Sequence, residues 1–335
     1  MFRIHFTQQD VSATRILAEP SPLWEIVLSC HMLAKRSDDP LLSGWHRNSR
    51  AHLEPGRPLR ESTDLFIHVN PAHGDFPDLL TPDTDACGVQ AGLEAVASTP
   101  TRRLSHEMAW VGRQRGSLTT AARDLAAGRS AAMEQLVTGM RDYFDAVIGP
   151  QWPWVTASFG ADLDLRTRCL ATGGLIAMLN SLHPSVRFDG SVLTITDFPG
   201  ERDLHLGGRG MVLVPSFFKS RTRPITLIDP ELPPVLVYPV DRTAGMLAAR
   251  QTEALAALLG RNRAAILDLC AVGGSTTSIA AQLGQSPSTI SEHLTVLRNA
   301  GLVASDRRGS TMQHRLRPLG LAMLEGQVAP PAGAP

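Results

Sequence analysis

Residues 285–302 read QSPSTISEHLTVLRNAGL, and this stretch decides how the C-terminal part of the chain folds. Ser286 is a favoured helix N-cap, and Pro287 occupies the first helical position, where its missing N–H costs nothing. Gly301 falls just past the expected end of the helix. Apolar residues recur between them at helical spacing, at Ile290, Leu294 and Leu297. The stretch therefore predicts an amphipathic helix over 287–300, which any surface helix or a helix in a DNA groove could match.

A shorter helix is predicted immediately upstream, over the TTSIAAQL segment at 276–283. Ser275 is a good N-cap for it, and Gly284 permits the tight reversal that ends it. Only three residues separate the two helices. Their apolar faces can therefore meet and fix the pair at a steep angle, as in a helix-turn-helix.

The segments on either side of this pair complete the pattern. Upstream, 244–259 and 261–271 read as helices. Downstream, LVASDR and STMQHRL flank Arg308-Gly309 and predict a hairpin, and Pro318 opens a last short helix. This order of helices and hairpin predicts a winged helix-turn-helix domain over 244–325, followed by a disordered tail at 326–335.

Short polar side chains point away from the apolar stripe of the second helix and can approach base edges. We expect contacts to bases or adjacent phosphates from Ser288, Thr289, Ser291, Glu292 and Thr295. We expect contacts to the DNA backbone from Ser286, Arg298, Arg307 and Arg308, with Gln285 also at the helix start. His293 lies beside the inward face, so packing or a phosphate contact is a better expectation for it than base reading.

The charge distribution agrees with a DNA-binding domain. The whole chain is neutral, with 32 basic and 32 acidic residues. Residues 250–325 hold eight arginines against five acidic residues, an excess of three positive charges. A basic excess at this end is what a phosphate-binding domain needs.

The segment AAILDLCAVGGSTTSIAAQLGQSPSTISEHLTVLRNAGLVASDRRGSTMQHRLRPLGLAML resembles the winged-helix domain of ArsR/SmtB-type bacterial transcriptional regulators. The run from Ser286 to Leu294 resembles that family's recognition-helix pattern. The preceding region resembles the long N-terminal domain of a subset of these regulators. The resemblance implies a homodimer on a roughly palindromic double-stranded DNA operator, usually a repressor that an effector releases.

Two departures from the family pattern affect these expectations. Relatives commonly carry Arg or Lys at the positions of Glu292 and Thr295, so the outward face here is acidic or neutral. Glu292 could accept from a cytosine amino group and so specify a base. Metal-sensing relatives have a Cys-x-Cys pair at the helix equivalent to 277–280, where this chain has no cysteine. We therefore expect no metal site and no cofactor.

Residues 1–243 predict an N-terminal α+β domain made of helices and an antiparallel sheet, with a possible effector-binding or dimerisation role. Helices are expected at 22–35, 117–148 and 161–182, the second capped by Ser117 or Thr120. Strands are expected at FRIHFT near the N-terminus and then at SVLTITD, RDLHLGG, GMVLVPSFF, PITLID and PVLVYPV.

The tryptophans of this region leave two readings open. Trp24, Trp152 and Trp154 are expected to pack in a core or a dimer interface by default, and a small-molecule effector pocket is the sharper alternative. The QWPWV motif motivates the pocket, because two tryptophans around a proline cannot both pack inward easily. A thiol or histidine site has no supporting cluster.

Other function classes have less support. The apolar content of 43% is that of a globular protein, and no apolar run approaches the roughly 20 residues of a membrane helix. No signal-peptide pattern opens the sequence, so we expect a cytoplasmic protein with free thiols. No nucleophile-elbow pattern is present, so we expect no enzyme. The rival hypothesis is a winged helix that docks on a protein partner instead of DNA.

Overall fold

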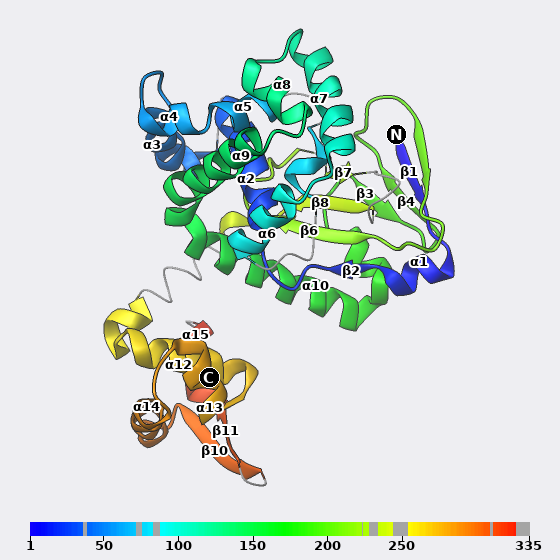
Figure 1. Ribbon diagram of the computed structural model, residues 1–335. Helices are drawn as coiled ribbons and strands as arrows, with labels where there is room; N and C mark the ends of the chain where they lie inside the picture. The colour runs from blue at the N-terminus through cyan, green and yellow to red at the C-terminus, as the bar shows by residue number, and fades with distance from the viewer. Residues whose placement is uncertain are drawn as a thin grey trace. The chain divides into compact units, whose positions relative to one another are not determined.

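The computed structural model describes residues 1–35, 39–71, 76–82, 88–222, 224–227, 234–243, 254–308 and 311–325. Contacts divide the chain into two compact units, Met1–Gly245 and Met246–Pro335 (Figure 1). The tail at 326–335, for which we predicted disorder, lies outside the described residues. Within the described ranges, no helix combines the length and the apolar content that crossing a membrane requires.

In its described residues, the first unit holds two four-stranded sheets. One has the order β3-β4-β1-β5. Its strands are β1 (Phe2–His5), β3 (Val186–Phe188), β4 (Val192–Ile195) and β5 (Arg202–His205). β1 runs antiparallel to β4 and parallel to β5, and β3 runs antiparallel to β4. The N-terminal strand thus pairs with two strands that lie about two hundred residues away in sequence.

The second sheet has the order β2-β6-β8-β7. Its strands are β2 (Arg15–Ile16), β6 (Val212–Ser216), β7 (Ile225–Leu227) and β8 (Val235–Pro239). β6 runs parallel to both β2 and β8, and only the β7–β8 pair of this sheet is antiparallel. The predicted mixture of helix and sheet is confirmed, but the prediction of one antiparallel sheet is wrong.

The parallel strands have a clear physical cause. Two hydrophobic clusters cover the second sheet, one on each face, and successive residues of β6 and β8 alternate between them. Val214 and Val237 belong to the first cluster, whereas Leu213 and Leu236 belong to the second. Strands buried on both faces read as solid apolar runs and are typical of parallel sheets covered by other elements.

Most helices of the first unit gather beside the sheets, and α10 runs along β6 (Figure 1). The helices are α1 (Gln8–Ala13), α2 (Pro22–Ala34), α3 (Ser43–His52), α4 (Pro58–Ser62), α5 (Asp64–Val69), α6 (Gly88–Ala97), α7 (Thr101–Arg115), α8 (Thr120–Ala126), α9 (Ser130–Tyr143) and α10 (Trp152–Asn180). Short helical turns lie at Pro40–Leu42, Asp78–Leu80, Phe144–Ile148 and Gly149–Gln151.

Two of the helix predictions need correction. The single helix expected over 117–148 is broken, because Gly128 adopts a φ of 72° between α8 and α9. The N-cap of α8 is Thr119, and not Ser117 or Thr120 as predicted. The Thr119 side chain accepts from the backbone N–H of Ala122. The helix expected over 161–182 begins earlier, at Trp152, and its backbone leaves the helical region at Gly174.

Buried polar groups fix helices of the first unit on its second sheet. Arg166 of α10 pairs with Asp162 at 2.6 Å, and Tyr238 of β8 donates to the same carboxylate at 2.6 Å. Glu25 of α2 accepts hydrogen bonds from the backbone N–H groups of Phe217 and Phe218 at 2.8 and 2.9 Å. These contacts offset part of the cost of burying the polar groups.

The second unit has the predicted winged-helix order. Residues 254–259 are helical, and the rest of the helix predicted at 244–259 lies outside the described residues. The elements that follow are α12 (Arg261–Val272), β9 (Gly274–Ser275), α13 (Thr276–Leu283), α14 (Pro287–Asn299), β10 (Val303–Arg308), β11 (Thr311–Leu316) and α15 (Pro318–Glu325). The sheet has the order β10-β11-β9, so a short third strand, which we did not predict, joins the hairpin.

Candidate nucleic-acid interface

The helix pair α13–α14 is fixed by the local signals that the sequence carries. The Ser275 side chain accepts from the backbone N–H of Ser278 at 3.1 Å, and the Ser278 hydroxyl accepts from the backbone N–H of Ser275 at 3.0 Å. This reciprocal pair satisfies two N–H groups at the start of α13. Gly284 ends the helix with a φ of 59°, a left-handed conformation that glycine adopts without strain.

The start of α14 is a cluster of hydroxyl groups. The Ser286 hydroxyl accepts from the backbone N–H of Thr289 at 3.2 Å and caps the helix. The same hydroxyl lies 2.8 Å from that of Ser288 and 2.9 Å from that of Thr289. Pro287 occupies the first helical position, as predicted. The cap therefore holds three of the predicted contact residues together at one helix end.

The two faces of α14 differ sharply. Ile290, Leu294 and Leu297 are at most 3% exposed and belong to the core of the second unit. Four predicted contact residues are exposed on the other side, namely Ser288, Ser291, Glu292 and Thr295. The packing of the helix thus consumes its apolar stripe and leaves a polar face open to a partner.

The hairpin β10–β11 forms the wing next to this pair. It pairs over six residues from Val303↔Leu316 to Arg308↔Thr311. Arg307 is exposed near the tip. Arg308 ends β10, and its side chain and the turn at 309–310 lie outside the described residues.

Residues 274–305 match the family model described as bacterial regulatory protein, arsR family. The second unit thus contains an ArsR-type helix-turn-helix domain at residues 274–305. No curated protein and no solved structure matches the chain. The match lies on β9, α13, α14 and the start of β10, and a long region precedes it. An ArsR-type domain makes the chain a DNA-binding transcription regulator in general terms.

The other predicted contact residues of the ArsR-type domain differ in how exposed they are. Arg298 and Thr295 are exposed on α14, and the Arg298 guanidinium reaches the Thr295 hydroxyl at 3.4 Å. The Thr295 hydroxyl also donates to the backbone carbonyl of Ser291 at 2.8 Å. His293 and Gln285 are half-buried. These two side chains have less freedom than the exposed hydroxyls, and the roles predicted for all of them stay predictions.

Glu292 keeps its carboxylate on the exposed face of the recognition helix. Within the described part of the chain, no ion pair engages it. The ion pair near the wing is elsewhere, between Arg315 and Asp306 at 2.9 Å, and both side chains are more than half exposed. An exposed acid at this place neither caps the helix nor stabilises the wing, so the structure leaves it available for a partner group.

The sequence predicted that His314 lies in the second strand of the hairpin, but it did not predict the burial or the hydrogen bonds of this residue. It lies in β11, is 5% exposed, and both ring nitrogens are hydrogen-bonded. Burial, followed by the charge of Arg298, lowers its pKa, so the ring is neutral at neutral pH. The alternation of inward and outward residues in a strand, with Leu316 two positions on, could have shown that it points inward.

Metal ligands do not gather in the described residues. No group of three or more His, Cys, Asp or Glu side chains there is arranged to hold a metal ion. Cys30, Cys169 and Cys270 are free thiols, and Cys87 lies outside the described ranges. Burial raises the pKa of Cys270 to about 11, so this thiol in the core of the ArsR-type domain is a poor ligand and a poor nucleophile.

The three tryptophans proposed for an effector pocket all pack in or against the same hydrophobic cluster. Trp24 is 1% exposed, and Trp152 and Trp154 are half-buried against the same hydrophobic cluster. The Trp152 ring meets that of Phe144 edge to face, with centroids 5.3 Å apart. Both tryptophans of the QWPWV motif therefore pack against the core, and an effector site beside them stays a prediction.

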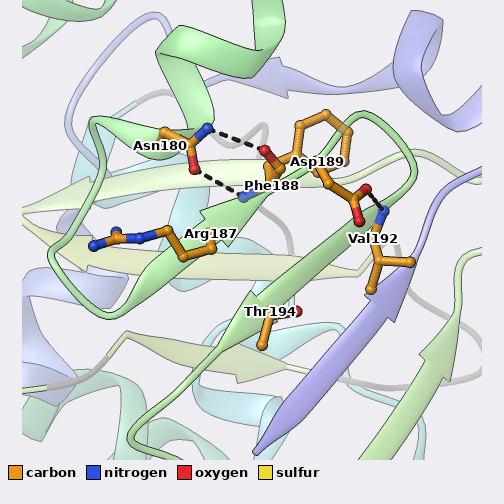
Figure 2. Close-up of a pocket in the computed structure, with 6 residues that line it drawn as sticks. All are labelled: Asn180, Arg187, Phe188, Asp189, Val192 and Thr194. Atoms are coloured by element: carbon orange, nitrogen blue, oxygen red, sulfur yellow. Dashed lines mark hydrogen bonds between the residues drawn. The ribbon is translucent and has the colours of Figure 1, made fainter.

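A pocket of about 420 Å³ lies elsewhere in the first unit, beside the β3–β4 hairpin (Figure 2). It is lined by Asn180, Arg187, Phe188, Asp189, Val192 and Thr194. Figure 2 shows the Asn180 amide bridging the backbone of Phe188, with hydrogen bonds of 2.8 and 3.0 Å. Asp189 accepts from the backbone N–H of Val192 at 2.8 Å. These polar groups are used to hold the hairpin together.

Proposed function

We propose that the chain is a sequence-specific regulator that binds double-stranded DNA through α14 and the β10–β11 wing. The observation that carries the proposal is the division of α14 into a buried apolar stripe and an exposed polar face. Short hydroxyl side chains and a carboxylate on that face match the donors and acceptors of a major groove. We further propose that the chain has no enzymatic activity.

We propose separate tasks for the residues of this exposed face and of the wing. Glu292 would accept from the amino group of a cytosine, and Ser288 and Ser291 would contact base edges or adjacent phosphates. The backbone N–H groups at the start of α14, capped by Ser286, would face a phosphate. Arg307 and Arg308 would meet the DNA backbone from the wing and supply the part of the affinity that depends on salt.

We propose that two copies act together and repress transcription. One recognition helix reads only a few base pairs, and two-fold symmetry doubles the site. The resemblance to ArsR-type regulators supports both points. A small-molecule effector bound by the first unit would release the DNA, and Trp152 and Trp154 are our candidates for its site.

Binding to duplexes selected from a random library tests the main proposal. We expect one preferred, roughly palindromic sequence, and a gel-shift assay with the region upstream of the chain's own gene should show retention. The absence of any preferred sequence in the selection would reject sequence-specific DNA binding. It would favour the alternative, a protein-docking winged helix, for which the exposed Glu292 and the 48% exposed Val296 are the supporting features.

A thermal-shift screen against metabolites tests the effector hypothesis separately. A ligand that binds near the QWPWV motif should raise the melting temperature of the parent chain. It should have a smaller effect on the variant with Trp152→Ala and Trp154→Ala. A broad library that shifts the parent nowhere would contradict the effector.

A further inference from the structure

His314 joins the wing to the first helix of the helix-turn-helix through two hydrogen bonds. Its Nδ1 atom lies 2.8 Å from the Ser305 hydroxyl, and its Nε2 atom lies 2.8 Å from the Thr276 hydroxyl. Ser305 is directly across from His314 in β10, and Thr276 is the first residue of α13. One imidazole ring thus contacts the hairpin and the helix pair at the same time.

The strands around His314 also connect the wing to α13. His314 belongs to the middle strand β11, which also pairs with Gly274 of β9. β9 leads directly into the N-cap of α13 at Ser275. Arg307 lies two residues beyond Ser305 on the same strand, toward the tip. His314 therefore joins the hairpin to α13 at the third of its six residue pairs, between Val303 at the base and the tip.

The bridge uses all of the hydrogen-bonding capacity of a neutral imidazole ring, in which one nitrogen donates and the other accepts. A hydroxyl can play either role, so Ser305 and Thr276 fit both ring tautomers. Because the ring is 5% exposed, water cannot readily replace a lost partner. Hydrophobic packing alone would bury an aliphatic side chain here at lower cost, so the polar bridge specifies an orientation.

We infer that His314 is a positioning residue that holds the wing on α13, so that Arg307 and Arg308 meet the DNA backbone. The inference rests on the proposed DNA binding for its functional part. In this role His314 itself contacts no base or phosphate and acts through the wing arginines.

Hydrogen exchange on the full chain without DNA tests the bridge by itself. In His314→Phe a phenyl ring replaces the imidazole and both hydrogen bonds are lost, and we expect the amides of β10 and β11 to exchange about tenfold faster than in the parent. Amides of α14 should change little. His314→Gln can keep the bond to Thr276, because its terminal amide reaches about as far as Nε2, and should recover part of the protection. Equal protection of the wing in parent and His314→Phe would overturn the inference, whatever the DNA result.

Salt-dependent binding to the selected duplex tests the function of the bridge. If two phosphate contacts depend on it, the loss of affinity between 50 and 200 mM salt should be about tenfold smaller in His314→Phe than in the parent. Adding Arg307→Ala and Arg308→Ala to His314→Phe should then have little further effect, while the preferred sequence stays the same. Ile290→Val is the matched control, because it weakens the same domain through α14 packing and should leave the salt dependence unchanged.

The outcomes separate the two proposals. A parent chain that prefers no duplex rejects the proposed function, while the exchange experiment still decides whether His314 holds the wing. Additive effects of the His314 and arginine substitutions, in a parent that does bind, would overturn the positioning role alone.

Discussion

The stability of the first unit should depend on pH because of Glu25. Its carboxylate is 1% exposed and accepts hydrogen bonds from Ser216, Phe217 and Phe218. Burial raises the pKa of Glu25 to about 7 and outweighs these hydrogen bonds and the charge of Arg242, all of which lower it. The folded state therefore binds the proton more tightly than the unfolded state does.

The sign and size of the effect follow from this difference. A raised pKa stabilises the fold fully below the unfolded value of 4.5, and this stabilisation is lost as the pH rises through 7. Between pH 5 and pH 8 the free energy of unfolding should fall by about 2.5 kcal/mol because of Glu25. In Glu25→Gln this part of the pH dependence should be absent, although the amide itself costs a constant amount at every pH.

Urea unfolding followed by tryptophan fluorescence measures this quantity. All five tryptophans of the sequence lie before residue 155, so the signal reports the first unit alone. The informative quantity is the change in the free energy of unfolding between pH 5 and pH 8 in the parent, minus the same change in Glu25→Gln. A difference below about 0.5 kcal/mol would refute the argument that desolvation dominates at Glu25.

Three further predictions concern the ArsR-type domain. Ile290→Ala removes a fully buried side chain from α14 and should cost about 3 kcal/mol of stability; circular dichroism on urea titration checks this, and a loss under 1 kcal/mol would show that α14 is loosely packed. Glu292→Ala should change the preferred sequence, and an unchanged binding-site selection profile would remove Glu292 from the base-reading residues. Arg307→Ala with Arg308→Ala should weaken binding to all duplexes alike and reduce the salt slope by about 2; an unchanged slope would mean that the wing contacts no phosphate.

The recognition helix shows how far local signals reach. The caps at Ser275 and Ser286, the left-handed Gly284 and the apolar spacing of α14 all act within one or two helical turns. Such signals lie in adjacent residues, so the sequence predicted the boundaries of these helices to within one residue. The same reasoning identified which side of α14 is buried. It did not show that Ser286, Ser288 and Thr289 bond to one another, because hydroxyl orientation depends on the finished turn.

The tertiary structure, and not the local sequence, decided which strands pair and in which direction. The apolar runs at 212–216 and 235–239 marked two strands, but their parallel direction depends on contacts with elements far away in the chain. Phe2 pairs with both Ile195 and Arg202, and no local pattern near residue 2 encodes those partners. A period of two predicts a strand and its faces, whereas direction and neighbours follow from how separate layers bury those faces.

The sequence by itself determined the ArsR-type domain, because capping, helical periodicity and turn chemistry are local and act in consecutive residues. Only the tertiary structure decided the two mixed sheets, the break at Gly128 and the placement of Trp152 and Trp154 against the core. It also decided the role of His314, whose partners lie 9 and 38 residues away in sequence. The physical reason is shared by all of these features: burying a surface requires a second surface, and the chain supplies it from a distant segment.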